Sequence, residues 1–214
     1  MPKQPNILGV VRRKRGYLLS YHRLLYDIDP ELLQAYDAFY TRFTLADKVL
    51  SPVEKETVWI ALIAATRARI GTIHLKRAAQ AGMGKNAIAD AFALAAACES
   101  LDALRFSVNA FDAWVDEPRL VKRYLRAFDV ARGRTRPKLA EIAAVVAHAG
   151  QRRAAGMRIH LKRAFKAGAR RAQVAEALSF VLLHCGGPTM LAAMDAWIAA
   201  ARKDGIPAPF RRNA

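Results

Sequence analysis

The feature that most constrains this chain is a six-residue sequence, Ile-His-Leu-Lys-Arg-Ala, that occurs twice. It spans residues 73–78 and recurs 86 positions later at residues 159–164. When both copies are extended to 19 residues, Ile73–Ala91 and Ile159–Ala177, 10 positions are identical. The matches include His, Lys, Arg and Gly, which an alanine-rich composition does not bring into register. The chain therefore contains a duplicated unit, and each copy carries a histidine.

The residues around both copies predict helices and no strands. Much of the 53% apolar content is alanine, the best helix former, and no hairpin pattern occurs. Ser51-Pro52-Val53-Glu54 is a typical helix start, with a capping box and a proline in the first turn. Gly82 and Gly168 suit the left-handed residue that ends a helix. We predict an all-α fold made of a duplicated helical repeat, with separate helices over 85–97 and 101–115.

Breaks in the helical pattern divide the chain into segments. Stretches that contain proline, glycine or basic residues predict a flexible basic tail over 1–16 and a second tail over 205–214. Between the tails we predict an N-terminal helical repeat over 17–117, a linker helix and polar break over 118–136, and a C-terminal helical repeat over 137–204. Asp112-Ala113-Trp114 recurs as Asp195-Ala196-Trp197, 83 positions later. Because this spacing is three shorter than the first one, residues were gained or lost between the two anchors.

Charge and cysteine content bound the classes of function. The net charge is +17, and the stretch from Arg152 to Arg171 holds eight Lys or Arg and no acid. Such a field attracts nucleic acid, anionic surfaces or anionic small molecules, although a solvated helix face gives the same pattern. Aromatic residues are not interleaved with these clusters, which disfavours a single-strand binding groove.

Other classes are disfavoured by what the chain contains. No apolar run is long enough to span a bilayer and no secretory signal is recognised, so we expect a cytoplasmic protein. Cys98 and Cys185 lie in apolar helical stretches and are expected to be buried, reduced thiols. The five histidines lack a tight ligand spacing, so the sequence predicts neither a metal site nor a cofactor.

One helix face in the second copy gathers residues that could carry chemistry. Arg153, Gly156, His160 and Arg163 recur at three- and four-residue steps and so share a face. Glu141 lies 19 residues before His160, on the preceding helix. If the two helices pair antiparallel, this carboxylate reaches the imidazole and raises its basicity. A buried structural histidine between two helices is the alternative interpretation.

These residues, taken in order, resemble the carboxymuconolactone decarboxylase and alkylhydroperoxidase D-type superfamily. The resemblance covers roughly residues 25–200 and rests on an ordered set of motifs: the Asp29-Pro30-Glu31-Leu32 lead-in, Leu50–Glu56, His74–Gly82, Glu141, His160–Gly168 and Cys185-Gly186-Gly187-Pro188. It implies an orthogonal helix bundle that assembles as a symmetric homo-oligomer.

The resemblance also implies roles for particular residues. In the peroxidase branch a Cys-x-x-Cys pair precedes the histidine, but Arg153 and Gly156 occupy those positions here, and Arg67 and Ile70 do so in the first copy. Peroxide reduction by disulfide cycling needs both thiols, so a peroxidase activity is doubtful. Lys55 falls at the glutamate position of the first copy, so only the second copy is expected to keep the His-Glu pair.

The decarboxylase branch manages without the cysteine pair. By this resemblance, a carboxy-lyase would use His160 and Glu141 for acid–base catalysis and Arg153, Arg163 and His184 to bind a small anionic substrate. Two alternatives stay open. The chain is either a non-catalytic helical scaffold or ligand-binding relative, since both copies lack the cysteines, or a basic protein that binds nucleic acid or an anionic surface.

Overall fold

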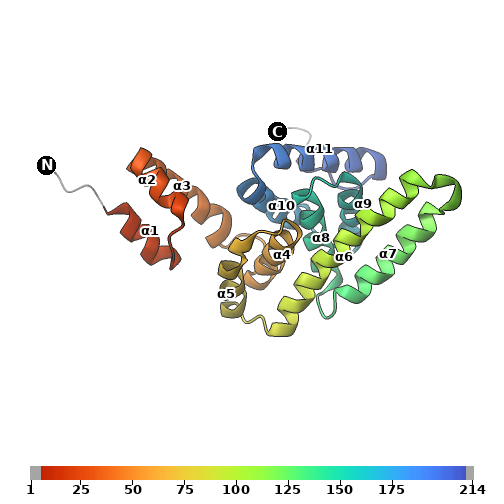
Figure 1. Cartoon of the computed structure of the whole chain (residues 1–214), viewed down its shortest axis with the longest axis horizontal. Coiled ribbons are helices and arrows are strands. Elements are labelled where there is room, and N and C mark those ends of the chain that lie inside the picture. Colours follow the sequence, from red (N-terminus) through yellow and green to blue (C-terminus); the bar gives the residue numbers. More distant parts are fainter. Residues whose placement is uncertain (1–5, 211–214) are drawn as a thin grey trace. The chain divides into compact units, whose positions relative to one another are not determined.

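The computed structural model describes residues 6–210, and these residues form α-helices joined by short turns, with no strand among them (Figure 1). The prediction of an all-α fold is therefore confirmed. No helix within this part of the chain is both long enough and apolar enough to serve as a transmembrane segment. The chain divides into two compact units, residues 1–46 and residues 47–214.

The first unit is a small bundle of three helices with its own hydrophobic core. It consists of α1 (Ile7–Arg15), α2 (Ser20–Ile28) and α3 (Pro30–Tyr40), followed by a π-helical turn at Thr41–Leu45. Asp29 caps α3 by accepting a hydrogen bond from the Glu31 amide, and Pro30 occupies the first helical position. Residues 7–15 were expected within a flexible tail but form a helix, because Ile7 and Val11 pack against Leu33.

The second unit contains both copies of the repeated hexapeptide. Its helices are α4 (Pro52–Ala65), α5 (Thr72–Gln80), α6 (Lys85–Ala110), α7 (Glu117–Ala131), α8 (Pro137–Gly150), α9 (Ala154–Lys166), α10 (Arg171–Cys185) and α11 (Gly187–Asp204). Short 3-10 turns at Arg69–Gly71 and Asp112–Trp114 join α4 to α5 and α6 to α7. The predicted stops are present: Gly82 and Gly168 follow α5 and α9 with φ of 90° and 82°.

The helices α4 and α8 form the centre of this unit and pack on each other. A helix that is apolar on every side is stable only when it is surrounded by protein, and α8 is buried from Leu139 to Ala149. The predicted capping box starts α4: the Ser51 hydroxyl accepts from the Glu54 amide, and the Glu54 carboxylate accepts from the Ser51 amide. These two central helices carry the acidic partners of both repeated histidines.

The two repeats differ most where α6 corresponds to α10 and α11. The predicted break between residues 97 and 101 is wrong, because α6 runs unbroken from Lys85 to Ala110. In the second repeat, Gly186 adopts φ 82° and ψ 173°, and Pro188 lies in the first turn of α11. The matching residues in the first repeat, Ser100 to Asp102, contain neither glycine nor proline and leave the helix intact.

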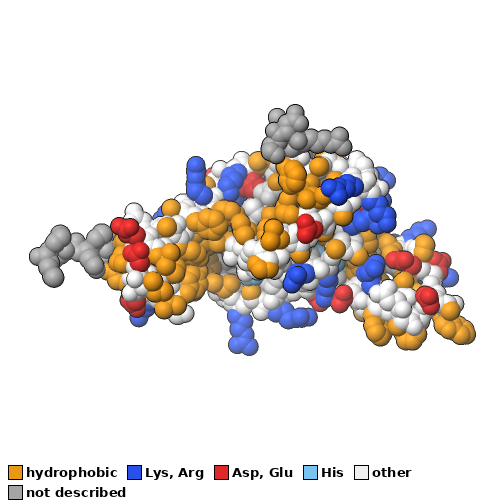
Figure 2. Space-filling model, turned by 90° about the horizontal axis from the view of Figure 1, so that it is seen from above, with side chains coloured by type: hydrophobic (Ala, Val, Ile, Leu, Met, Phe, Trp, Pro, Cys, Tyr) orange, Lys and Arg blue, Asp and Glu red, His pale blue; other side chains and the backbone are white. Residues whose placement is uncertain are grey.

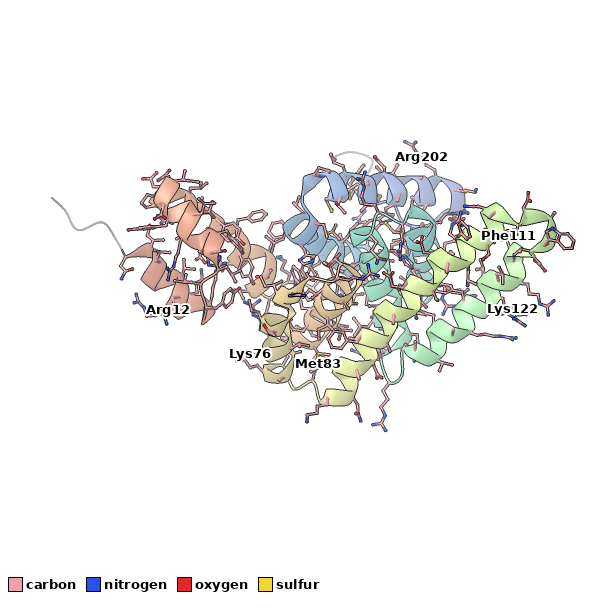
Figure 3. The ribbon with its side chains drawn as sticks, in the orientation of Figure 1. Arg12, Lys76, Met83, Phe111, Lys122 and Arg202 are labelled. Carbon is pink, nitrogen blue, oxygen red and sulfur yellow. The ribbon has the colours of Figure 1, made fainter. Side chains whose placement is uncertain are left out.

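The unbroken helix α6 pairs side by side with α7, and the two form a hairpin that ends near Phe111 (Figures 1 and 3). As a result, the two copies of the Asp-Ala-Trp motif have opposite environments. Trp197 is 1% exposed and donates a hydrogen bond from Nε1 to the Pro207 carbonyl, whereas Trp114 is 89% exposed.

Candidate functional site

The second repeat contains the predicted contact between His160 and Glu141. His160 lies on α9 and Glu141 on the adjacent α8, and Nδ1 of the imidazole is 2.7 Å from Oε2 of the carboxylate. Both residues are buried. The catalytic role of this pair stays a prediction, but the geometry that it requires is present.

Arg163 lies beside this pair rather than in an open pocket. Its Nε donates to Oε1 of Glu141 at 2.7 Å, and its terminal nitrogen contacts Asp129 at 2.6 Å. Burial disfavours the charged guanidinium, but the two carboxylates outweigh it and raise the pKa of Arg163. Glu141 thus accepts hydrogen bonds on both oxygens. The structure places Arg163 where it positions the carboxylate, not where a substrate would meet it.

Sequence analysis missed the group on the other side of the imidazole. The Tyr124 hydroxyl, from α7, lies 2.5 Å from His160 Nε2 and 3.3 Å from His148 Nε2, and Tyr124 affects the pKa of the Cys98 thiol. Tyr124, His148 and Cys98 are all buried. They come from α7, α8 and α6, so no local spacing in the sequence pointed to them. A local signal that could have found this helix face is the pair of aromatic residues Tyr124 and Phe128, which lie four positions apart on α7.

Burial keeps these groups neutral. It raises the pKa of Tyr124 far above its usual value and raises that of Cys98 to about 12. Burial, together with the nearby His160 and Arg153, lowers the pKa of His148 well below its usual value. The result is a continuous hydrogen-bonded chain, Glu141–His160–Tyr124–His148.

The chain of hydrogen bonds ends at a surface pocket of about 230 Å³ at the start of α9. Its wall includes Asp102, Arg105, His148, Arg152, Arg153 and Gly156. A side chain at residue 156 would overlap the His148 ring, so glycine is needed at this position. Arg152 adopts a left-handed backbone with φ of 58°, which a residue other than glycine rarely takes.

Arg153 lines this pocket as predicted for a residue near a substrate, but it is already paired. Its guanidinium lies 3.3 Å from Glu99 and 3.3 Å from Asp102, and it donates to Gln151 at 2.8 Å. It also lines a neighbouring pocket of about 130 Å³ that Met157 and Ala193 share. Arg153 therefore contributes to the walls of both pockets.

His184 does not join His160. Its Nε2 is 2.7 Å from the Thr66 hydroxyl, and its ring meets the edge of Trp59 at a centroid distance of 6.0 Å. Trp59 in turn stacks on His74 of the first repeat at 4.4 Å. The C-terminal end of α10 thus contributes to the surroundings of the first histidine, so the predicted grouping of His184 with the His160 site is not what the structure shows.

The first repeat also keeps a buried His-Glu pair, and the prediction that only the second does so is wrong. His74 Nδ1 is 2.8 Å from Oε2 of Glu56, and both residues are buried. The acid stands 18 residues before the histidine here and 19 before it in the second repeat, so a fixed offset pointed to the wrong neighbour. Lys55 instead pairs with Asp47 at 3.1 Å.

The basic stretch around α9 is partly neutralised by acids. Arg158 and Lys162 both pair with Asp204, at 2.6 and 3.2 Å. On the face drawn in Figure 2, Lys and Arg side chains stand at separate places across the 47–210 unit, with acidic side chains beside several of them. On this face the cations stand at separate places rather than as one broad basic surface.

Comparison with known proteins agrees with this architecture. Residues 30–113 and 118–199 each match the carboxymuconolactone decarboxylase family, and the second match includes α7, which sequence analysis treated as a linker. A crystal structure from Burkholderia xenovorans, provisionally described as a gamma-carboxymuconolactone decarboxylase subunit, superposes with a TM-score of 0.64 at 18% identity, covering 93% of this chain and 99% of that one. No curated protein matches the chain in sequence.

Proposed function

This chain belongs to the carboxymuconolactone decarboxylase family, and on that premise we propose that it is an enzyme that decarboxylates a small, carboxylate-bearing lactone. The observation that carries the proposal is the buried hydrogen-bonded chain from Glu141 to His148, which opens at a pocket with arginines in its wall. Arginine suits carboxylate recognition, because its planar fork of donors matches two oxygens. Arg105 and Arg152 are the candidate anion-binding residues.

The chain of hydrogen bonds supplies the proton that the reaction needs. Decarboxylation breaks a carbon–carbon bond, releases carbon dioxide and leaves the bonding electrons on an enolate, which must be protonated at carbon. In the acid form, His160 is an imidazolium held by Glu141, and its Nε2–H donates to the Tyr124 oxygen. The Tyr124 hydroxyl donates to His148 Nε2. His148 Nδ1 is buried beside Gly156 in the wall of the pocket, and the proposal requires the ring to turn its Nδ1–H toward a bound substrate.

Each proton then moves by one place. His148 gives its Nδ1 proton to the enolate carbon, Tyr124 reprotonates His148, and His160 reprotonates Tyr124. His160 ends neutral, with its remaining proton shared with Glu141. His148 is thus the catalytic residue, while Tyr124, His160 and Glu141 act through it; general acid catalysis of this kind contributes roughly 100- to 10,000-fold in rate.

The test is turnover of carboxymuconolactone by the wild-type chain and matched variants. We expect H148Q and Y124F to lower kcat by about 100-fold or more with KM little changed, since neither removes an anion-binding group. H74Q, which alters the equivalent histidine in the first repeat, is the control and is expected to retain turnover. In D2O, the product is expected to carry one deuterium at the enolate carbon that His148 protonates.

Two outcomes would contradict the proposal. Binding of the lactone without turnover would make the chain a ligand-binding relative rather than an enzyme. Loss of turnover in H74Q but not in H148Q would move the chemistry to the first repeat. Circular dichroism of every variant separates a loss of chemistry from a loss of fold.

A further inference from the structure

The buried cluster that ends the hydrogen-bonded chain holds a second set of donors. Cys98, His148 and His160 each present one ligand atom, and these three atoms lie within 4.8 Å of one another. They come from α6, α8 and α9, and all three residues are 0% exposed. We propose that this cluster is a binding site for a divalent transition-metal ion of the zinc class, with Cys98, His148 and His160 as its protein ligands.

The donor types fit that class of ion. One thiolate and two imidazoles form the mixed sulfur and nitrogen set that zinc and cobalt prefer, whereas magnesium and calcium need oxygen ligands. Ligand atoms around a tetrahedral zinc stand roughly 3.3–3.7 Å apart, given zinc–nitrogen and zinc–sulfur bonds of about 2.0 and 2.3 Å. The three donors lie within 4.8 Å of one another and must take up these separations when an ion binds.

The surroundings of His160 match those of a metal-bound histidine. Its Nδ1 is held by Glu141 at 2.7 Å, so Nε2 is the nitrogen that faces Cys98 and His148. A carboxylate on the outer nitrogen fixes the ring and increases its basicity toward a metal. Arg163 in turn holds Glu141 at 2.7 Å, so the outer partner is itself fixed.

His148 presents its Nε2 on the cluster side, 3.3 Å from the Tyr124 oxygen that also contacts His160 Nε2. The residue also lines the 230 Å³ pocket, so it lies between the surface and the cluster and gives an ion a route inward. The Tyr124 oxygen, 2.5 Å from His160 Nε2, stands near the fourth corner of the site.

Metal binding and the hydrogen-bonded chain exclude each other, because both use Nε2 of His160. A bound ion would replace the hydrogen bond between the Tyr124 hydroxyl and that nitrogen, and it would therefore block proton transfer. Binding must also remove the proton of Cys98, which releases one proton per ion. The inference does not depend on the proposed decarboxylation, since the site is defined by its donors and is tested without substrate.

The experiment is titration of the metal-free chain with Co²⁺, followed by the absorbance of the cobalt–thiolate charge-transfer band. The chain has only two cysteines, Cys98 and Cys185. We expect the C185S variant, which keeps a single thiol, to develop the band and to saturate at one ion per chain. C98S is expected to lose the band, and E141Q, which removes the charge from the outer partner of His160, to bind about 10- to 100-fold more weakly.

Y124F separates this inference from the proposed function. It interrupts the proton path, but it leaves the sulfur and both nitrogens, so a water fills the fourth position and the band is expected to persist. Absence of the band in folded C185S at one equivalent of Co²⁺ would overturn the proposal, and so would a band in C98S that vanishes in C185S. Circular dichroism shows that each variant is folded.

Discussion

His74 and His160 occupy equivalent places in the two repeats, yet they have different neighbours. Each imidazole donates from Nδ1 to the carboxylate of a buried glutamate on the preceding helix, α4 or α8. The other side of His74 stacks on Trp59, whereas the other nitrogen of His160 bonds to Tyr124. The shared pair therefore links two helices in both repeats, and it is the added groups around His160 that give one of the two sites a path to a pocket.

The comparison separates structural from chemical roles. A His-Glu pair occurs in both repeats, but a proton path is described for only one of them. The presence of the pair is therefore explained by the packing of α4 on α5 and of α8 on α9. Catalysis needs more than this pair. Among the described residues, the features found beside His160 and not beside His74 are the tyrosine bridge to a buried histidine, His148, and Gly156, which leaves room for that ring.

The largest expected difference between the repeats concerns the two copies of Asp-Ala-Trp. W197A removes a buried indole and its hydrogen bond to Pro207, and should lower the free energy of unfolding by about 3–5 kcal/mol. W114A removes an exposed side chain and should change it by less than about 0.5 kcal/mol. Urea unfolding followed by circular dichroism measures both, and equal losses would show that the α6–α7 hairpin end is covered in solution.

A second difference concerns the two glutamates. E141Q breaks a buried contact with both His160 and Arg163, and should lower the free energy of unfolding by about 3 kcal/mol. E56Q changes the carboxylate that contacts His74 and leaves an amide oxygen to accept from its Nδ1, so a loss of about 1 kcal/mol is expected. The same urea titration compares them, and a larger loss in E56Q would contradict the ranking.

The smallest predicted effect tests the corner between α10 and α11. Gly186 has a backbone conformation, φ 82° and ψ 173°, that side chains tolerate poorly, so G186A should lower the free energy of unfolding by about 2 kcal/mol. S100G places glycine at the matching point of α6 and should cost about 0.5 kcal/mol through helix propensity alone. A cost of G186A no greater than that of S100G would show that the corner relaxes freely.

Local patterns predicted much of the fold. The capping box at Ser51, the left-handed stops at Gly82 and Gly168 and the pairing of Glu141 with His160 all depend on residues that are close in the sequence or on adjacent helices. Such features follow from backbone geometry and from the 3.6-residue period, both of which can be read along the chain.

The wrong predictions arose where a fixed spacing along the sequence was used in place of three-dimensional geometry. Lys55 was matched to Glu141 by a constant offset of 86, but the spacing from the acid to the histidine is one residue shorter in the first repeat, 18 instead of 19, and Glu56 takes the inner position. The predicted end of a helix near Ala97 failed because nothing in that stretch breaks a helix, and a loose similarity to the second repeat suggested a break.

By itself, the sequence determined that the chain is helical, that it is duplicated and that the second copy sets His160 beside Glu141, because propensity, capping and periodicity act within one helix or between neighbours. Only the tertiary structure decided which histidine has a tyrosine, a second histidine and a thiol around it. Those groups stand on α6, α7 and α8, and their approach depends on how long helices cross, which no spacing along the chain records.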